Sequence, residues 1–254
     1  MSTPYLSGNR TIALVDRGTG AVFLAVFLYA LSAGLLIQLF ILPVLLPHLH
    51  AGHGLLKGVD SVGFHEIASE LADRVLTHGW GAWEVRPNSH SPAGIAGALY
   101  AITGVREPWV MVPVNAVLFA LSAATIFAII RQMTENTVAS WAAVLPFALF
   151  PSAAIEYADL HKDVWSCAGS MLILFAFGRA QIAQPLKLED VVTALVICLM
   201  GALLVWIARA YLVRVLLYAS VVAVVALVAI EIALNRFRIN RDLLKRCAVD
   251  RKST

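Results

Sequence analysis

Long uninterrupted apolar runs dominate this chain, and they limit the folds that it can adopt. The first occupies residues 21–46 and the last residues 211–234. A helix of about 20 apolar residues crosses the ~30 Å hydrocarbon core of a bilayer. Backbone groups find no water in lipid, so only helices or closed barrels cross it, and continuous rather than alternating runs favour helices. We therefore expect an all-α integral membrane protein.

The composition supports a membrane protein. Hydrophobic residues make up 60% of the 254 positions and charged residues only 14%, whereas soluble domains carry about a quarter charged residues. The first run is longer than the apolar part of a signal peptide and no small-residue cleavage site follows it, so we expect it to remain as a span. Cys167, Cys198 and Cys247 are scattered, and their spacing suggests neither a disulfide framework nor a metal site.

We expect about six transmembrane helices, at residues 21–46, 109–130, 138–150, 164–177, 191–207 and 211–234. Basic residues gather at Arg131, in residues 179–187 and in the C-terminal tail, and such segments face the cytoplasm. Residues 92–105 are apolar but too short to span, which predicts a re-entrant or surface helix. Counting back from the tail then places both termini in the cytoplasm.

This topology divides the chain into a cytoplasmic N-terminal arm (1–20), a transmembrane domain (21–234) and a basic cytoplasmic tail (235–254). The large first loop, residues 47–92, lies outside and holds six of the seven histidines. Within it, residues 62–76 place apolar side chains at helical spacing, which predicts an amphipathic helix on the membrane surface. The histidine spacing is not that of a zinc site, so we interpret these residues as interfacial.

Asp60 opens this helical segment. Its carboxylate could remove a proton from an acceptor hydroxyl as a general base, or hold a divalent cation against phosphate. The alternative is that it only caps the helix, a role that Ser61 could also fill.

Two further polar clusters fall on the same predicted outer side. Residues 156–163 include Asp159, His161, Lys162 and Asp163, and a lysine beside a helix start can bind phosphate. This cluster could instead be a solvated turn in which Asp163 caps the next helix. Arg209 could clamp a lipid phosphate, or could simply extend to the membrane interface with Tyr211 and Arg214. Polar groups gathered at a membrane face are candidates for function.

Several short motifs resemble those of the membrane-embedded GT-C glycosyltransferases, in the bacterial branch of aminoarabinose transferases and protein mannosyltransferase-like enzymes. The motifs are Asp60 with Phe64-His65-Glu66-Ile67-Ala68, Ser91-Pro92, Leu99-Tyr100, Thr103-Gly104, Pro151-Ser152, Leu160-His161-Lys162-Asp163 and Arg209-Ala210-Tyr211. The resemblance covers residues 20–215. It implies a transferase of the bacterial cytoplasmic (inner) membrane and cell envelope that uses a polyprenyl-phosphate sugar as donor.

The resemblance also implies roles for individual residues. Asp60 matches the catalytic acid of the first outer loop, and Asp159 or Asp163 matches a second acid that assists or binds metal. Lys162 and Arg209 would contact the donor phosphate. The remaining expected substrate-binding residues are His65, Glu66, His161 and Tyr211.

Two departures from the family pattern leave alternatives open. Asp60-Ser61-Val62 stands in place of paired acids, so we assign no metal ligand and leave a divalent cation as an open cofactor. Family members usually have more spans, which suggests a truncated chain or a partner chain that supplies a C-terminal half. The alternative function is a non-catalytic module that binds a lipid-linked sugar or scaffolds a larger complex. The basic tail favours membrane lipid over nucleic acid as a partner.

Overall fold

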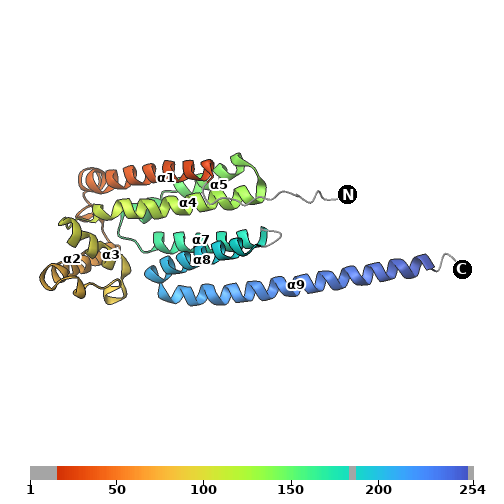
Figure 1. Ribbon diagram of the computed structural model, residues 1–254. Helices are drawn as coiled ribbons and strands as arrows, with labels where there is room; N and C mark the ends of the chain where they lie inside the picture. The colour runs from red at the N-terminus through yellow and green to blue at the C-terminus, as the bar shows by residue number, and fades with distance from the viewer. Residues whose placement is uncertain (1–15, 183–186, 251–254) are drawn as a thin grey trace. The chain divides into compact units, whose positions relative to one another are not determined.

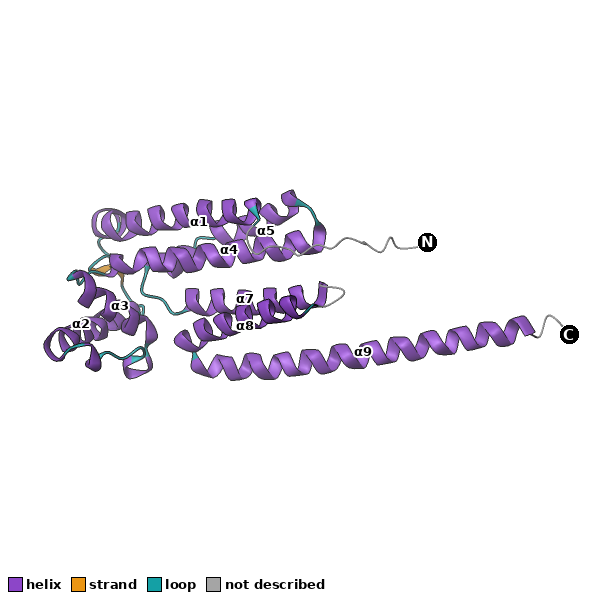
Figure 2. Cartoon of the chain, in the orientation of Figure 1, coloured by secondary structure: helices purple, strands orange, loops and turns teal. Residues whose placement is uncertain are grey.

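The computed structural model describes residues 16–182 and 187–250, including the side chains of most of them. The described backbone is almost entirely helical, with one small hairpin (Figures 1 and 2). It forms two compact units, residues 1–209 and 210–254. The expectation of an all-α protein is confirmed.

The first unit begins with helix α1 (Arg17–Leu36), which continues as the π-helical stretch η1 (Ile37–Leu45). The next segment holds the hairpin β1 (His50–Gly52) and β2 (Leu55–Leu56), then α2 (Ser61–His78), η2 (Trp80–Ala82), η3 (Pro87–Ser89) and α3 (Ser91–Thr103). The rest comprises η4 (Pro108–Met111), α4 (Val112–Thr134), α5 (Thr137–Leu149), α6 (Ala153–Ala158), α7 (Asp163–Ile182) and α8 (Leu188–Ala208). The second unit is α9 (Ala210–Asp250).

Among the described residues, four helical stretches are long and apolar enough to cross a membrane. They are Arg17–Leu45, Pro108–Thr134, Leu188–Ala208 and Ala210–Ile230. Each coincides with a run that the sequence predicts as a span. The other two predicted spans are also helical, in α5 and α7, but α5 has only 13 residues. All six predicted helices are therefore present, and the crossing of the membrane by all six stays a prediction.

Helix α4 is the centre of the first unit. It packs against α1, α5 and α7, while α8 packs against α7 (Figure 1). In the α4 span, 61% of the most apolar 18-residue stretch is buried, against 22% of the corresponding stretch in the first span and 28% in α8. Its buried face is rich in small side chains, including Ala116, Ala120, Ala123 and Ala124, so neighbouring helices approach closely.

The predicted amphipathic helix exists as α2, but its apolar face covers protein rather than the membrane surface. Phe64, Ala68, Leu71 and Val75 are buried, and α2 packs against α3. The contact is close because α3 carries Gly97, where an added Cβ would lie 3.0 Å from both the Ala68 carbonyl oxygen and a Leu71 methyl carbon. The apolar face of α2 therefore packs on α3, and its position on the membrane surface stays a prediction.

Two helix ends depend on proline and glycine. The first helix passes through Pro43, because the chain widens there into the π-helical turns of η1, which tolerate its missing N–H. The last helix continues to Asp250 through the predicted tail, since residues 210–250 contain no glycine or proline. Most of the predicted N-terminal arm, with Arg10, lies outside the described residues, as do the side chains of the basic tail.

Helices α7 and α8 touch through their backbones. A Cβ added at Gly169 would lie 2.4 Å from the Gly201 carbonyl oxygen, and one added at Gly201 would lie 2.6 Å from the Gly169 carbonyl oxygen. The reciprocal contact places two main chains side by side without intervening side chains. The pairing of these two helices therefore depends on both glycines.

We predict that Gly169→Ala lowers the free energy of unfolding by about 1–3 kcal/mol, because the new methyl group overpacks the α7–α8 contact. Gly178→Ala on the same helix is the matched control, since nothing lies within 4 Å of a Cβ added there. Alanine favours a helix interior over glycine, so the control should be neutral or stabilising. Denaturation in detergent, monitored by circular dichroism, would measure the free energy of unfolding of both variants. Equal stability of the two variants would contradict the proposed contact.

Candidate functional site

The loop between α6 and α7 is fastened to the start of α2. The Ser61 hydroxyl donates a hydrogen bond to Asp159 Oδ2 over 3.0 Å, and the Leu160 N–H donates to Asp159 Oδ1 over 2.8 Å. The Asp159 residue is only 5% exposed. Burial raises the pKa of this carboxyl group, although the hydrogen bonds from Leu160 and Ser61 oppose the shift. The Asp159 side chain thus links two segments that are about 100 residues apart in sequence.

Two buried amide side chains hold the same loop from the transmembrane helices. Gln38 of η1 donates to the Ala158 carbonyl oxygen, and Asn115 of α4 donates to the Asp159 carbonyl oxygen over 2.8 Å. Both residues are at most 2% exposed. Neither residue was predicted from the sequence, although an amide in an otherwise apolar span is a recognisable signal of an internal polar contact. They position Asp159 from inside the bundle.

Lys162 extends from this loop over the aromatic ring of Phe64 in α2. Its Nζ lies 5.8 Å from the ring centroid, within the range of a cation–π contact. The other neighbour of Phe64 is His90, whose ring centroid lies 5.0 Å away. The Lys162 ammonium group forms no ion pair among the described residues. It is therefore a half-buried cation that a carboxylate does not neutralise.

Asp163 joins the same loop to the end of α8. Its carboxylate forms an ion pair with the guanidinium group of Arg209, and its other oxygen lies 3.4 Å from His161 Nδ1. The predicted clusters around residues 60, 159–163 and 209 therefore meet at one end of the first unit, where Figure 1 shows α2 and α3. Arg209 is already paired with Asp163. It would therefore bind a phosphate only by dividing its interactions between the phosphate and the Asp163 carboxylate.

Asp60 remains exposed at the first turn of α2. It holds the N-cap position with helical dihedral angles (φ −65°, ψ −15°), but its side chain accepts no capping hydrogen bond. The alternative capping role of Asp60 is therefore wrong, and Ser61 does not replace it, because its hydroxyl group donates to Asp159. Within residues 16–182 and 187–250, no hydrogen bond or ion pair engages the Asp60 carboxylate, so it can accept a proton from a ligand.

The structure does not bring every predicted substrate-binding residue to this place. His65 is 8% exposed and turns toward α3, where its Nδ1 lies 3.1 Å from the Tyr100 hydroxyl oxygen, and its ring contacts His53. Burial lowers the pKa of His65, and the nearby His53 adds to the shift. The neighbouring Glu66 points to solvent on the exposed side of α2.

Tyr211 and Arg214 belong to the second unit, residues 210–254, and are exposed within it. The predicted substrate contact of Tyr211 stays a prediction, as do those of Glu66 and His65. The side chain of Glu156 lies outside the described part of the chain.

An apolar cavity of about 400 Å³ adjoins Asp163. It lies between α4, α5 and α7, and Phe119, Phe147, Phe150 and Val164 supply much of its wall. Among the described residues, no group of three His, Cys, Asp or Glu side chains converges as a metal site. The site therefore combines an exposed carboxylate, a half-buried ammonium group and a hydrocarbon-lined cavity.

No protein-family model, curated protein or solved structure matches this chain. An unpaired carboxylate can remove a proton, and a cation held over an aromatic ring can bind an anion.

We predict that Asp159→Asn removes a component of the pH dependence of folding. Burial places the folded-state pKa above the ordinary value of 3.8, so the protonated carboxyl group favours the folded state. This contribution to stability is complete below the ordinary pKa and is lost as pH rises through the folded-state pKa.

Wild type should therefore lose stability relative to Asp159→Asn as pH rises from ~4 toward neutrality. Chemical denaturation of both proteins in detergent across this range would measure the difference. A constant difference in unfolding free energy between the two proteins would show that the Asp159 pKa is not raised by folding.

Proposed function

We propose that this protein is a glycosyltransferase that transfers a sugar from a polyprenyl phosphate to a hydroxyl acceptor at the outer face of the bacterial cytoplasmic membrane. The observation that carries the proposal is the meeting of Asp60, Lys162 and the Asp163–Arg209 pair at one end of the helices. It supplies one proton acceptor and one unneutralised cation beside a cavity that suits hydrocarbon.

In this mechanism the Asp60 carboxylate takes the proton of the acceptor hydroxyl group. The hydroxyl oxygen attacks the anomeric carbon of the donor sugar, and the bond from that carbon to the phosphate oxygen breaks. The leaving phosphate keeps the bonding electron pair, and the Lys162 ammonium group stabilises its charge. Attack opposite the leaving group inverts the anomeric configuration. The phosphate is already a good leaving group, so orientation and charge stabilisation provide most of the catalysis.

The other predicted residues have supporting roles in this proposal. Arg209 binds Asp163 and thereby fixes the first turn of α7, next to Lys162. Asp159 positions the loop through Ser61, and its burial keeps it away from the acceptor. His161 lies between these groups and contacts Asp163. A divalent cation is not required by these steps.

The orientation belongs to the same proposal. Six crossings, with both termini in the cytoplasm, bring the Asp60 end of the first unit outside and leave Arg131 and Arg179 inside. This arrangement follows the positive-inside rule. It directs the acceptor hydroxyl to the outer aqueous phase and the polyprenyl chain to the bilayer.

We predict that Asp60→Asn lowers the transfer rate by about 10²–10⁴-fold, because the amide cannot accept the proton. Purified protein in vesicles would be incubated with a radiolabelled polyprenyl-phosphate sugar, and products would be separated from donor. Glu70→Gln is the matched control, since Glu70 is an exposed acid further along α2. Full activity of Asp60→Asn would refute the mechanism, and donor binding without turnover in wild type would favour a non-catalytic module.

We predict that Lys162→Gln weakens donor binding by about 10-fold or more, because one charge-assisted contact to phosphate is lost. Equilibrium binding of the labelled donor to protein in vesicles would measure this change. Lys57→Gln is the control, because Lys57 is an exposed lysine whose Nζ donates to the His48 carbonyl oxygen. Equal loss of affinity in both variants would indicate a nonspecific electrostatic effect and would contradict the assigned role of Lys162.

A further inference from the structure

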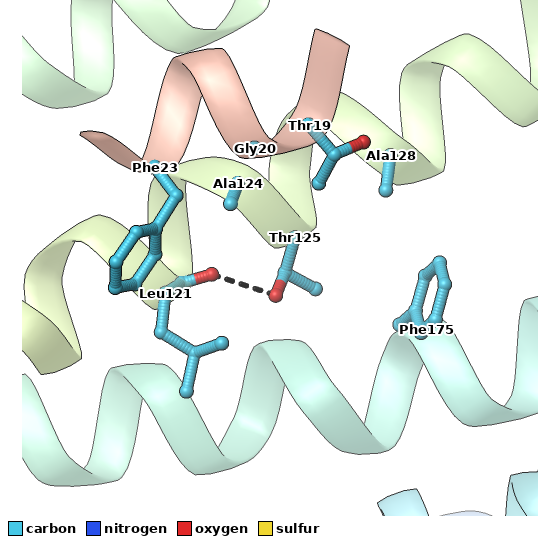
Figure 3. A pocket seen from close by; sticks show the side chains of 8 residues that line it. All are labelled: Thr19, Gly20, Phe23, Leu121, Ala124, Thr125, Ala128 and Phe175. Atoms are coloured by element: carbon cyan, nitrogen blue, oxygen red, sulfur yellow. Dashed lines mark hydrogen bonds between the residues drawn. The ribbon is translucent and has the colours of Figure 1, made fainter. Parts of the chain in front are cut away.

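A second apolar cavity lies between α1, α4 and α7, at the other end of these helices from α2 and α3. Its volume is about 250 Å³, and α1 contributes Thr19, Gly20 and Phe23 to its wall. Helix α4 contributes Leu121, Ala124, Thr125 and Ala128, and α7 contributes Phe175. Figure 3 shows Phe23 and Phe175 on opposite sides of this cavity, with Thr125 between them.

The cavity wall offers no polar group to a ligand. The Thr125 hydroxyl donates to the Leu121 carbonyl oxygen over 2.7 Å (dashed in Figure 3), and the Thr19 hydroxyl lies near the Asp16 carboxylate. Both threonines can therefore present methyl groups to the cavity. A sugar, nucleotide or peptide would leave its own polar groups without partners there, which costs free energy. The chemistry of the wall suits a hydrocarbon chain alone.

The surroundings favour a hydrocarbon chain from a lipid. The residues contributed by α1 and α4 belong to two of the stretches that are long and apolar enough to span a membrane. In a bilayer, acyl chains are the molecules in contact with such surfaces. An empty cavity would forfeit the dispersion contacts of its lining atoms, so an acyl chain that enters it is stabilised.

The charge at the start of α1 indicates the kind of lipid. Arg17 is the first residue of α1 and is exposed, although a cation is unfavourable at a helix amino end. Across residues 16–182 and 187–250, no carboxylate pairs with Arg17. Arg131, at the same end of α4, is already bonded to Thr137. Arg17 is therefore available to an anionic group outside the protein.

We propose that this cavity binds one acyl chain of an anionic phospholipid, whose headgroup lies beside Arg17. The lipid comes from the leaflet at the amino end of α1, on the side opposite the candidate transferase site. The bound chain fills the space between α1, α4 and α7 and fastens three helices together. This proposal does not depend on glycosyl transfer.

The test uses the full chain in vesicles of phosphatidylcholine and phosphatidylglycerol in equal amounts. A trace of phosphatidylglycerol carries a photoreactive diazirine on an acyl chain, and crosslinked peptides are identified by mass spectrometry. Wild type should be labelled in the peptides that contain Phe23, Leu121 and Phe175. Replacing the probe by the phosphatidylcholine equivalent should lower labelling about fivefold, and Arg17→Gln should abolish this preference, as expected for one arginine at an anionic surface.

Gly20→Leu is the decisive variant. Nothing lies within 4 Å of a Cβ added at Gly20, so the leucine side chain can enter the cavity without displacing the helix. By taking the place of about two methylenes, it should lower labelling about tenfold. Ala25→Leu, on an exposed part of the same helix, should label like wild type and controls for added bulk.

Two results would overturn the proposal. Unchanged labelling in Gly20→Leu would show that the probe reports lipid around the whole protein rather than lipid in the cavity. Labelling of these peptides only after deletion of residues 1–14 would show that the chain's own N-terminal arm is the occupant.

Discussion

The end of the first unit that carries α2 and α3 depends on the hydrogen bonds that hold Ala158 and Asp159. Gln38 and Asn115 bind the two carbonyl oxygens from the transmembrane helices, and Ser61 binds the Asp159 carboxyl group from α2. A buried polar segment is stable only when its groups have such partners. Together these contacts fix the loop that carries Lys162 and Asp163, and they connect it to the start of α2.

The two cationic side chains at this loop, Lys162 and Arg209, have different electrostatic surroundings. Arg209 is engaged by Asp163, whereas Lys162 lies over the Phe64 ring and lacks a carboxylate partner among the described residues. An aromatic ring holds a cation in place without cancelling its charge. The side chain best placed to receive an anion is therefore Lys162, and Arg209 stabilises the turn from which it extends.

The sequence predicted the helical segments well because continuous apolar runs leave few alternatives in a bilayer. It also identified residues 60, 159–163 and 209 as polar clusters on one side. It could not show that Asp159 is buried while Asp60 is exposed, because that difference depends on Gln38 and Asn115. The apolar face of α2 was predicted, but its neighbour α3 was not, because an amphipathic pattern shows which face is buried and not what covers it.

The backbone contact between Gly169 and Gly201 has a consequence for how the protein is made. Helix α7 is not among the stretches apolar enough to span by themselves, whereas α8 is. Their close contact and the Arg179–Asp190 ion pair near the turn that joins them let the more apolar helix α8 stabilise the less apolar helix α7 in the membrane. We expect the two to enter the membrane together as a helical hairpin, so that α7 waits at the translocation channel until α8 has been synthesised.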